Sequence, residues 1–218
     1  MVSGHVLQKI MVAALAVLAA AGIAGAAAIP FFFESQSLYY KFGTDKALLQ
    51  WGKAAGLVAL VLMVYQVLLV SRFSFLEKQV SLKRLFALHK GGGILITLLV
   101  VLHPVMILGA EGFVLFPLER RYWPEFLGVF LVFAIPGIAA VSVWRAKLKI
   151  AFKPWQALHR IGTPLVTGLA FVHAFYVSET FGFRIPGTGL FLAAAVVLAL
   201  LARIYIRRLY SRQFKRRQ

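Results

Sequence analysis

The sequence has 218 residues, 61% of them hydrophobic, and a formal net charge of +17. So apolar a chain has too little polar surface to cover a soluble domain, which excludes a soluble enzyme or a soluble nucleotide-binding module. The basic residues lie between apolar runs, where they explain membrane topology, and this excludes nucleic-acid binding as their purpose. The absence of cysteine excludes disulfides and thiolate or iron–sulfur ligation within the chain.

Apolar runs long enough to cross a bilayer fill nearly the whole chain. A hydrocarbon core about 30 Å thick needs about 20 residues of helix. We therefore predict an all-α integral membrane protein, a six-transmembrane-helix bundle that forms one domain over residues 1–218. The predicted spans are approximately residues 10–29, 51–70, 85–109, 126–144, 155–178 and 189–206.

The first span is rich in Ala and Gly, which predicts close packing against a neighbouring helix. The same stretch also resembles a signal peptide, because Ala26 and Ala28 offer a cleavage site. Its apolar run of about twenty residues exceeds the usual 7–15 of a signal peptide, and only Lys9 precedes it as a basic residue. These features favour a retained span.

The loop charges predict the orientation. Basic side chains gather after the second span, after the fourth span and in the tail: Arg72, Lys78, Lys83, Arg84, Lys90; Arg145, Lys147, Lys149, Lys153, Arg160; and Arg203, Arg207, Arg208, Arg212, Lys215, Arg216, Arg217. The alternate loops hold the acidic residues Glu34, Asp45, Glu111, Glu119, Glu125 and Glu179, with only Lys41, Lys46, Lys53, Arg120, Arg121 and Arg184 to balance them. Because Lys and Arg mark the cytoplasmic side, both termini are predicted to be cytoplasmic and the membrane to be the cell (inner) membrane.

Four histidines lie in the third and fifth spans. Residues 88–104, LHKGGGILITLLVVLHP, hold His89 and His103, and residues 158–173, LHRIGTPLVTGLAFVH, hold His159 and His173. Fourteen residues of helix rise about 21 Å and stop about 40° short of whole turns, so both histidines of a span lie on one side, near opposite faces of the membrane. The two spans run in the same direction. This predicts that His89 pairs with His159 near the cytoplasmic face and His103 with His173 near the outer face.

Polar side chains inside a bilayer are expensive and usually mark function. One alternative is that each histidine is structural and bonds to a neighbouring helix, in a non-haem membrane scaffold or transporter. Four histidines at equal spacing and matching depth favour a functional role. Two imidazoles without a carboxylate or thiolate do not complete a zinc or non-haem iron site, whereas haem needs only axial ligands. The sequence therefore predicts a transmembrane domain that binds two haems, with these histidines as the iron ligands.

Other residues near the histidines fit a haem site. Gly92 and Gly93 follow His89, and Gly162 follows His159, where a missing side chain leaves room for a porphyrin or allows close helix packing. Basic side chains are candidates to neutralise the anionic propionates. Those near the inner haem are Arg84, Lys90, Arg160, Lys83 and Lys153, and those near the outer haem are Arg120, Arg121 and Arg184, although topology alone also explains them.

At LHKGGG…LHP and WQALHRIG…VH the chain resembles the ferric reductase-like transmembrane domain superfamily. That superfamily includes ferric reductases, NADPH oxidases and the haem membrane subunit of the bacterial periplasmic methionine sulfoxide reductase system. The resemblance covers roughly the second to sixth spans. It implies a six-helix bundle with two b-type haems on the four histidines and electron flow from the cytoplasm to an acceptor outside.

The sequence departs from its relatives at two points. Ferric reductases and NADPH oxidases continue into a fused FAD and NAD(P)H-binding domain, whereas this sequence ends after a basic tail, so we expect a separate flavoprotein or quinol as donor. The methionine sulfoxide reductase subunit typically lacks a counterpart of His89. The expected protein is a cytochrome b-like membrane subunit of an oxidoreductase, with the lipid bilayer, a donor and an outer acceptor as partners. A further alternative has quinol oxidised within this chain.

Overall fold

The computed structural model describes residues 4–216, which form helices and no strand. The helices are α1 (Gly4–Phe32), α2 (Gln36–Tyr39), α3 (Gly43–Val70), α4 (Ser74–Gln79), α5 (Leu82–Ala110), α6 (Trp123–Trp144), α7 (Phe152–Val177) and α8 (Arg184–Arg216), with short 3-10 turns η1 (Arg120–Tyr122) and η2 (Glu179–Gly182). The side chains of Arg208 and of the basic residues from 211 onward lie outside the described residues. Each predicted span falls within one long helix or ends one residue beyond it.

Five helices in the described part of the chain are long and apolar enough to cross a membrane: α1, α3, α5, α6 and α8. The chain is therefore a multi-pass membrane protein. Helix α7, which holds the fifth predicted span, is not among the five, although its 26 residues exceed the 22 of α6. Its hydropathy is lowered by His159, Arg160, His173 and two threonines, so the polar residues that single out this helix also keep it out of the five.

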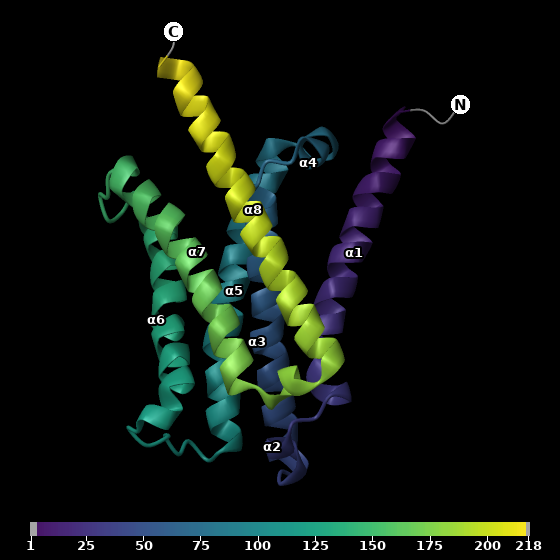
Figure 1. The fold of residues 1–218 in the computed structure, drawn as a ribbon, viewed down its shortest axis with the longest axis vertical. Coiled ribbons are helices and arrows are strands. Elements are labelled where there is room, and N and C mark those ends of the chain that lie inside the picture. Colours follow the sequence, from purple (N-terminus) through teal and green to yellow (C-terminus); the bar gives the residue numbers. More distant parts are fainter. Residues whose placement is uncertain (1–3, 217–218) are drawn as a thin grey trace.

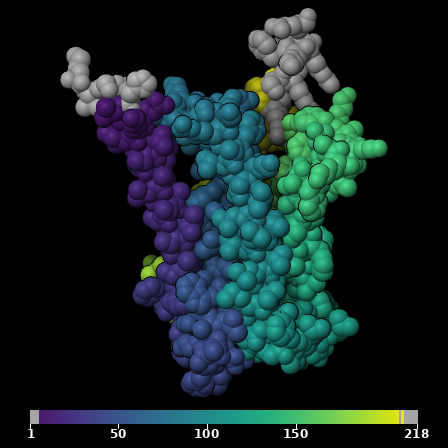
Figure 2. All heavy atoms as spheres, turned by 180° about the vertical axis from the view of Figure 1, so that it is seen from behind, coloured from purple at the N-terminus to yellow at the C-terminus, as the bar shows by residue number. Residues whose placement is uncertain are grey.

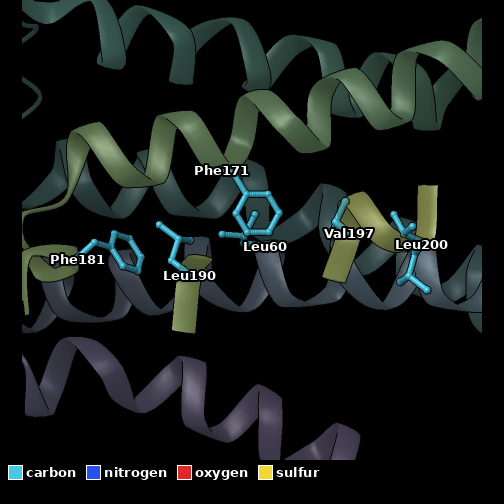
Figure 3. Close-up of a cluster of buried hydrophobic side chains, with 7 residues drawn as sticks. Leu60, Phe171, Phe181, Leu190, Val197 and Leu200 are labelled. Atoms are coloured by element: carbon cyan, nitrogen blue, oxygen red, sulfur yellow. The ribbon is translucent and has the colours of Figure 1, made fainter. Parts of the chain in front are cut away.

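Helix α3 forms the centre of the bundle. It packs extensively on α5 and on α1 and also contacts α7 and α8, while α6 pairs with α7. A run of small residues on α3, among them Gly52, Ala54, Ala55 and Ala59, is buried and lets these neighbours approach closely. Figure 3 shows one buried cluster in which Leu60 of α3 meets Phe171 of α7 and Val197 of α8.

The ends of the helices divide into two sides. The start of α1, the end of α8, α4 and the α6–α7 turn all lie at one end of the bundle (Figure 1). The α5–α6 and α7–α8 connections and α2 lie at the opposite end (Figure 1). The loops that carry the basic clusters therefore share one end of the molecule, and α5 and α7 run away from that end in the same direction.

Helix α1 is peripheral. Figure 2 shows it in purple along one edge, with the α6–α7 hairpin in green along the other. It rests on α3, where the Tyr65 hydroxyl donates to the carbonyl of Ala19 at 3.1 Å. Only Ala26 and Pro30 are buried along its described length. Most of α1 is therefore exposed to the surroundings of the bundle, and its Ala- and Gly-rich face is packed only where it meets α3.

Candidate functional site

The structure brings the four histidines together as two pairs between α5 and α7. The ring centres of His89 and His159 are 6.0 Å apart, and those of His103 and His173 are 6.4 Å apart. In both pairs the ring planes cross at 80°. The members of each pair are the ones that equal spacing and parallel direction predict.

The ring separations match two imidazoles that share one metal ion. A ligating imidazole nitrogen lies about 2 Å from its metal and about 1 Å from the centre of its own ring, so two rings on opposite sides of one metal have centres about 6 Å apart. No group of three His, Cys, Asp or Glu side chains gathers within the described residues. Each pair therefore offers two nitrogen ligands, and a porphyrin that brings four nitrogens of its own fits this donor set.

Backbone carbonyls fix the imidazoles of His103 and His173, which we call the outer pair after the side of the membrane predicted for them; His89 and His159 are the inner pair. Nδ1 of His103 donates to the carbonyl of Gly52 on α3 at 2.7 Å, and Nδ1 of His173 donates to the carbonyl of Pro124 on α6 at 2.8 Å. A carbonyl only accepts hydrogen bonds, so Nδ1 carries the proton in both rings. Nε2 then keeps its lone pair, which is the form of histidine that binds a metal through Nε2.

A glycine four residues after each accepting carbonyl makes these hydrogen bonds possible. A helical carbonyl points toward the residue four positions later, and Gly56 and Gly128 occupy those positions. A Cβ on Gly56 would lie 2.9 Å from Nδ1 of His103, and one on Gly128 would lie 2.5 Å from Cε1 of His173. Any larger residue at these two positions would occupy the space of the histidine rings.

Side chains, rather than backbone, surround His159 of the inner pair. The Ser142 hydroxyl donates to the carbonyl of Ile138 at 2.7 Å, so at 3.2 Å it accepts from Nδ1 of His159. The indole of Trp155 stacks on the His159 ring with centres 5.6 Å apart, and its Nε1 donates to the same hydroxyl at 3.2 Å. A serine oxygen has two lone pairs, so it can accept both bonds.

His89 differs from the other three histidines. Its Nδ1 is buried and has no hydrogen-bond partner within the described part of the chain. The ring lines a small cavity of about 240 Å³ that lies between α3, α4 and α5 and is mostly apolar. The Arg72–Glu77 ion pair lies at this cavity as well.

The glycines predicted to make room for a porphyrin have different surroundings. The amide of Gln66 on α3 occupies the space beside Gly92, and the side chain of Ile138 lies 3.1 Å from the place of a Cβ on Gly162. Nothing lies within 4 Å of that place on Gly93. At Gly92 and Gly162, the space left by the missing side chain is thus filled by a side chain of a neighbouring helix.

The predicted propionate partners lie near the histidines in sequence and are exposed. Arg84 and Lys90 flank His89 on α5, and Arg160 follows His159 on α7. These three form no hydrogen bond or ion pair with the described residues, so their charges are available to a ligand. On the opposite side, Arg121 pairs with Glu119 at 2.8 Å.

Several residues of the site were missed by the sequence analysis. The carbonyl acceptors and the two glycines behind the outer histidines carry no side-chain signal. The sequence does contain a signal for Ser142 and Trp155. Ser142 carries a hydroxyl in an otherwise apolar run, and Trp155 lies one helical turn before His159. Their role depends on which face of α6 meets α7, and the sequence alone does not give it.

Comparison with known families identifies the domain. Residues 55–170 match the ferric reductase like transmembrane component family. The match runs from α3 into α7 and includes His89, His103 and His159, with His173 just beyond it. No curated protein and no solved structure gives a significant match. Since the matched segment covers more than half of the sequence, the chain belongs to the ferric reductase like transmembrane component family.

Proposed function

We propose that this protein carries electrons across the cell membrane through two bis-histidine b-type haems, one held by His89 and His159 and the other by His103 and His173. The observation that carries the proposal is the pair of ring separations, 6.0 and 6.4 Å, at two levels of the same two helices. Membership of the ferric reductase like family supports transmembrane electron transfer. Each haem, when bound, supplies a reversible one-electron carrier.

The residues around each histidine pair serve to bind and orient a haem rather than a substrate. Each pair of imidazoles would supply two nitrogen ligands to a bound haem, which would leave no coordination position for a substrate. The carbonyls of Gly52 and Pro124 and the hydroxyl of Ser142 hold three of the rings in the Nδ1-protonated form. The final acceptor is therefore reduced either by outer-sphere electron transfer from a haem or on a partner protein, as expected for a membrane subunit of an oxidoreductase.

The proposed arrangement in the membrane has six spans, with α7 as the fifth, in a single domain over residues 1–218. The 26 residues of α7 make a helix about 39 Å long at about 1.5 Å per residue, which exceeds a hydrocarbon core of about 30 Å. The basic loops lie at one end of the bundle (Figure 1), which we assign to the cytoplasm together with both termini. Arg84, Lys90 and Arg160 then face the cytoplasmic side, where they pair with the propionates of the inner haem.

The donor is proposed to be a separate flavoprotein or a quinol on the cytoplasmic or membrane side, and the acceptor lies on the outer side. The protein purified in detergent should contain two haems per chain and give sharp visible bands on reduction. In vesicles with ferricyanide trapped inside, an impermeant external reductant should reduce the trapped ferricyanide only when the protein is present. A colourless protein would instead support a scaffold or transporter with structural histidines, and coloured protein without transfer would contradict the conduit.

Single cysteines test the proposed orientation, because the chain has no cysteine of its own. Leu118→Cys lies between α5 and α6, Lys147→Cys in the α6–α7 turn and Gly182→Cys in η2, all at exposed positions. An impermeant maleimide added to intact spheroplasts should label the cysteines at 118 and 182, and label that at 147 only after permeabilisation. If positions 147 and 182 label from the same side, α7 does not span and the six-span arrangement is wrong.

A further inference from the structure

Two helices in contact, α3 and α5, each carry a buried polar side-chain atom without a hydrogen-bond partner among the described residues. Nδ1 of His89 and Oε1 of Gln66 are both buried side-chain atoms without a hydrogen-bond partner in the described part of the chain. One is a nitrogen that can donate a hydrogen bond, and the other is an amide oxygen that can only accept one. Burial of an unsatisfied polar group costs about 1–3 kcal/mol, so two such groups close together call for an explanation.

The helix packing places these two side chains on facing surfaces. The amide of Gln66 on α3 lies against Gly92, which follows His89 by three residues and so lies on the same side of α5. The His89 ring lines a cavity together with Leu69 and Val70, which follow Gln66 by three and four residues on the same side of α3. Thus Gln66 and His89 lie on the sides of α3 and α5 that face each other, at neighbouring levels of the α3–α5 contact.

The other three histidines show what His89 lacks. Each of them has a carbonyl or hydroxyl oxygen that accepts from Nδ1. A histidine that binds iron through Nε2 carries its proton on Nδ1 and is normally held by such an acceptor. The side-chain torsions of Gln66 can change without movement of the backbone, so other positions on the α5 side are open to its amide oxygen.

We infer that Gln66 is the hydrogen-bond acceptor for Nδ1 of His89 in the haem-loaded protein, and that Gly92 is a glycine because it admits the Gln66 amide. The inference rests on the proposed haem function. It assigns Gln66 as a positioning residue, which acts on the inner haem only through His89. With this bond, all four imidazoles have an acceptor outside α5 and α7, two of them backbone carbonyls and two of them side-chain oxygens.

The test uses Gln66→Leu, which keeps the volume and removes the acceptor, and Gln66→Glu, which supplies a stronger one. A potentiometric titration followed by absorbance and EPR resolves the inner and outer haems. Loss of an acceptor makes the imidazole a weaker donor to iron, so Gln66→Leu should raise the inner-haem midpoint potential and weaken inner-haem retention about 10- to 100-fold. Gln66→Glu should retain haem and lower the same potential below that of the wild type. The outer haem should not change in either variant.

Two neighbouring glycines provide the matched control. Gly92→Ala should displace the Gln66 amide and reproduce the effect of Gln66→Leu, whereas Gly91→Ala, which meets nothing within 4 Å, should resemble the wild type. The double variant Gly92→Ala/Gln66→Leu should be no worse than either single variant, because the two act on one hydrogen bond. An unchanged inner-haem potential in Gln66→Leu, or equal shifts of both haems, would overturn the assignment. A wild-type protein without haem would instead refute the proposed function.

Discussion

Replacement of His103 or of His173 by alanine is expected to lower the bound haem from two per chain to one. Each imidazole supplies one axial bond, and the apolar interior offers no substitute ligand, since no third His, Cys, Asp or Glu gathers at either pair among the described residues. The haem that remains should be the inner one, with its potential unchanged. Haem quantified per chain, together with the reduced spectrum, measures this result directly.

The same experiment tests which histidines share a site. The double variant His103→Ala/His173→Ala should retain as much haem as either single variant, because both changes remove one site. The double variant His103→Ala/His159→Ala should retain none. Leu98→Ala, at a position on α5 that is 62% exposed, is the control for general damage to that helix and should keep both haems. Equal haem loss in the two double variants would show that the pairs are assigned wrongly.

Substitution of Gly128 by alanine is expected to remove the outer haem as effectively as loss of a ligand. The new Cβ would lie 2.5 Å from Cε1, 3.1 Å from Nδ1 and 3.2 Å from Nε2 of His173, so the methyl group would meet the ring itself. The ring cannot withdraw without breaking its hydrogen bond to the carbonyl of Pro124. Overpacking of this kind costs about 1–3 kcal/mol, which is concentrated here on one ligand.

Gly137 on the same helix provides the control for Gly128. A Cβ at Gly137 meets nothing within 4 Å, so Gly137→Ala should keep both haems and the thermal stability of the wild type. Haem content and the midpoint of thermal unfolding in detergent are the two measurements. A Gly128→Ala protein with both haems and an unshifted outer potential would show that the contact with His173 is relieved by a small movement of α6.

Much of the architecture could be predicted from the sequence, because helix periodicity and hydrophobic length are local properties. The fourteen-residue spacing on two parallel helices was enough to indicate which histidines meet. Helix α7 shows the limit of this reasoning. His159, His173 and Arg160 lower its hydropathy, so the helix that carries half of the proposed ligands is the one that composition alone identifies least clearly as a span.

The contacts that hold the ligands could not be predicted in this way. The carbonyls of Gly52 and Pro124 have no signature in the sequence, since every residue has a carbonyl. Gly128 resembles other glycines of apolar helices until α6 is placed beside α7. Gln66 has no feature in the sequence that links it to His89, and only the packing of α3 on α5 shows that its amide lies next to Gly92. These features depend on which helices are neighbours, and only the tertiary structure gives those neighbours.

The two pairs of histidines are anchored by different kinds of atom, and this affects how each can vary during evolution. A main-chain oxygen holds both rings of the outer pair, and mutation cannot delete such an atom while the helix persists. A hydroxyl holds His159, so a single codon change at Ser142 is enough to alter the electronic character of that ligand. We therefore expect natural variation in redox potential to accumulate at the His89–His159 pair, while the His103–His173 pair stays constant.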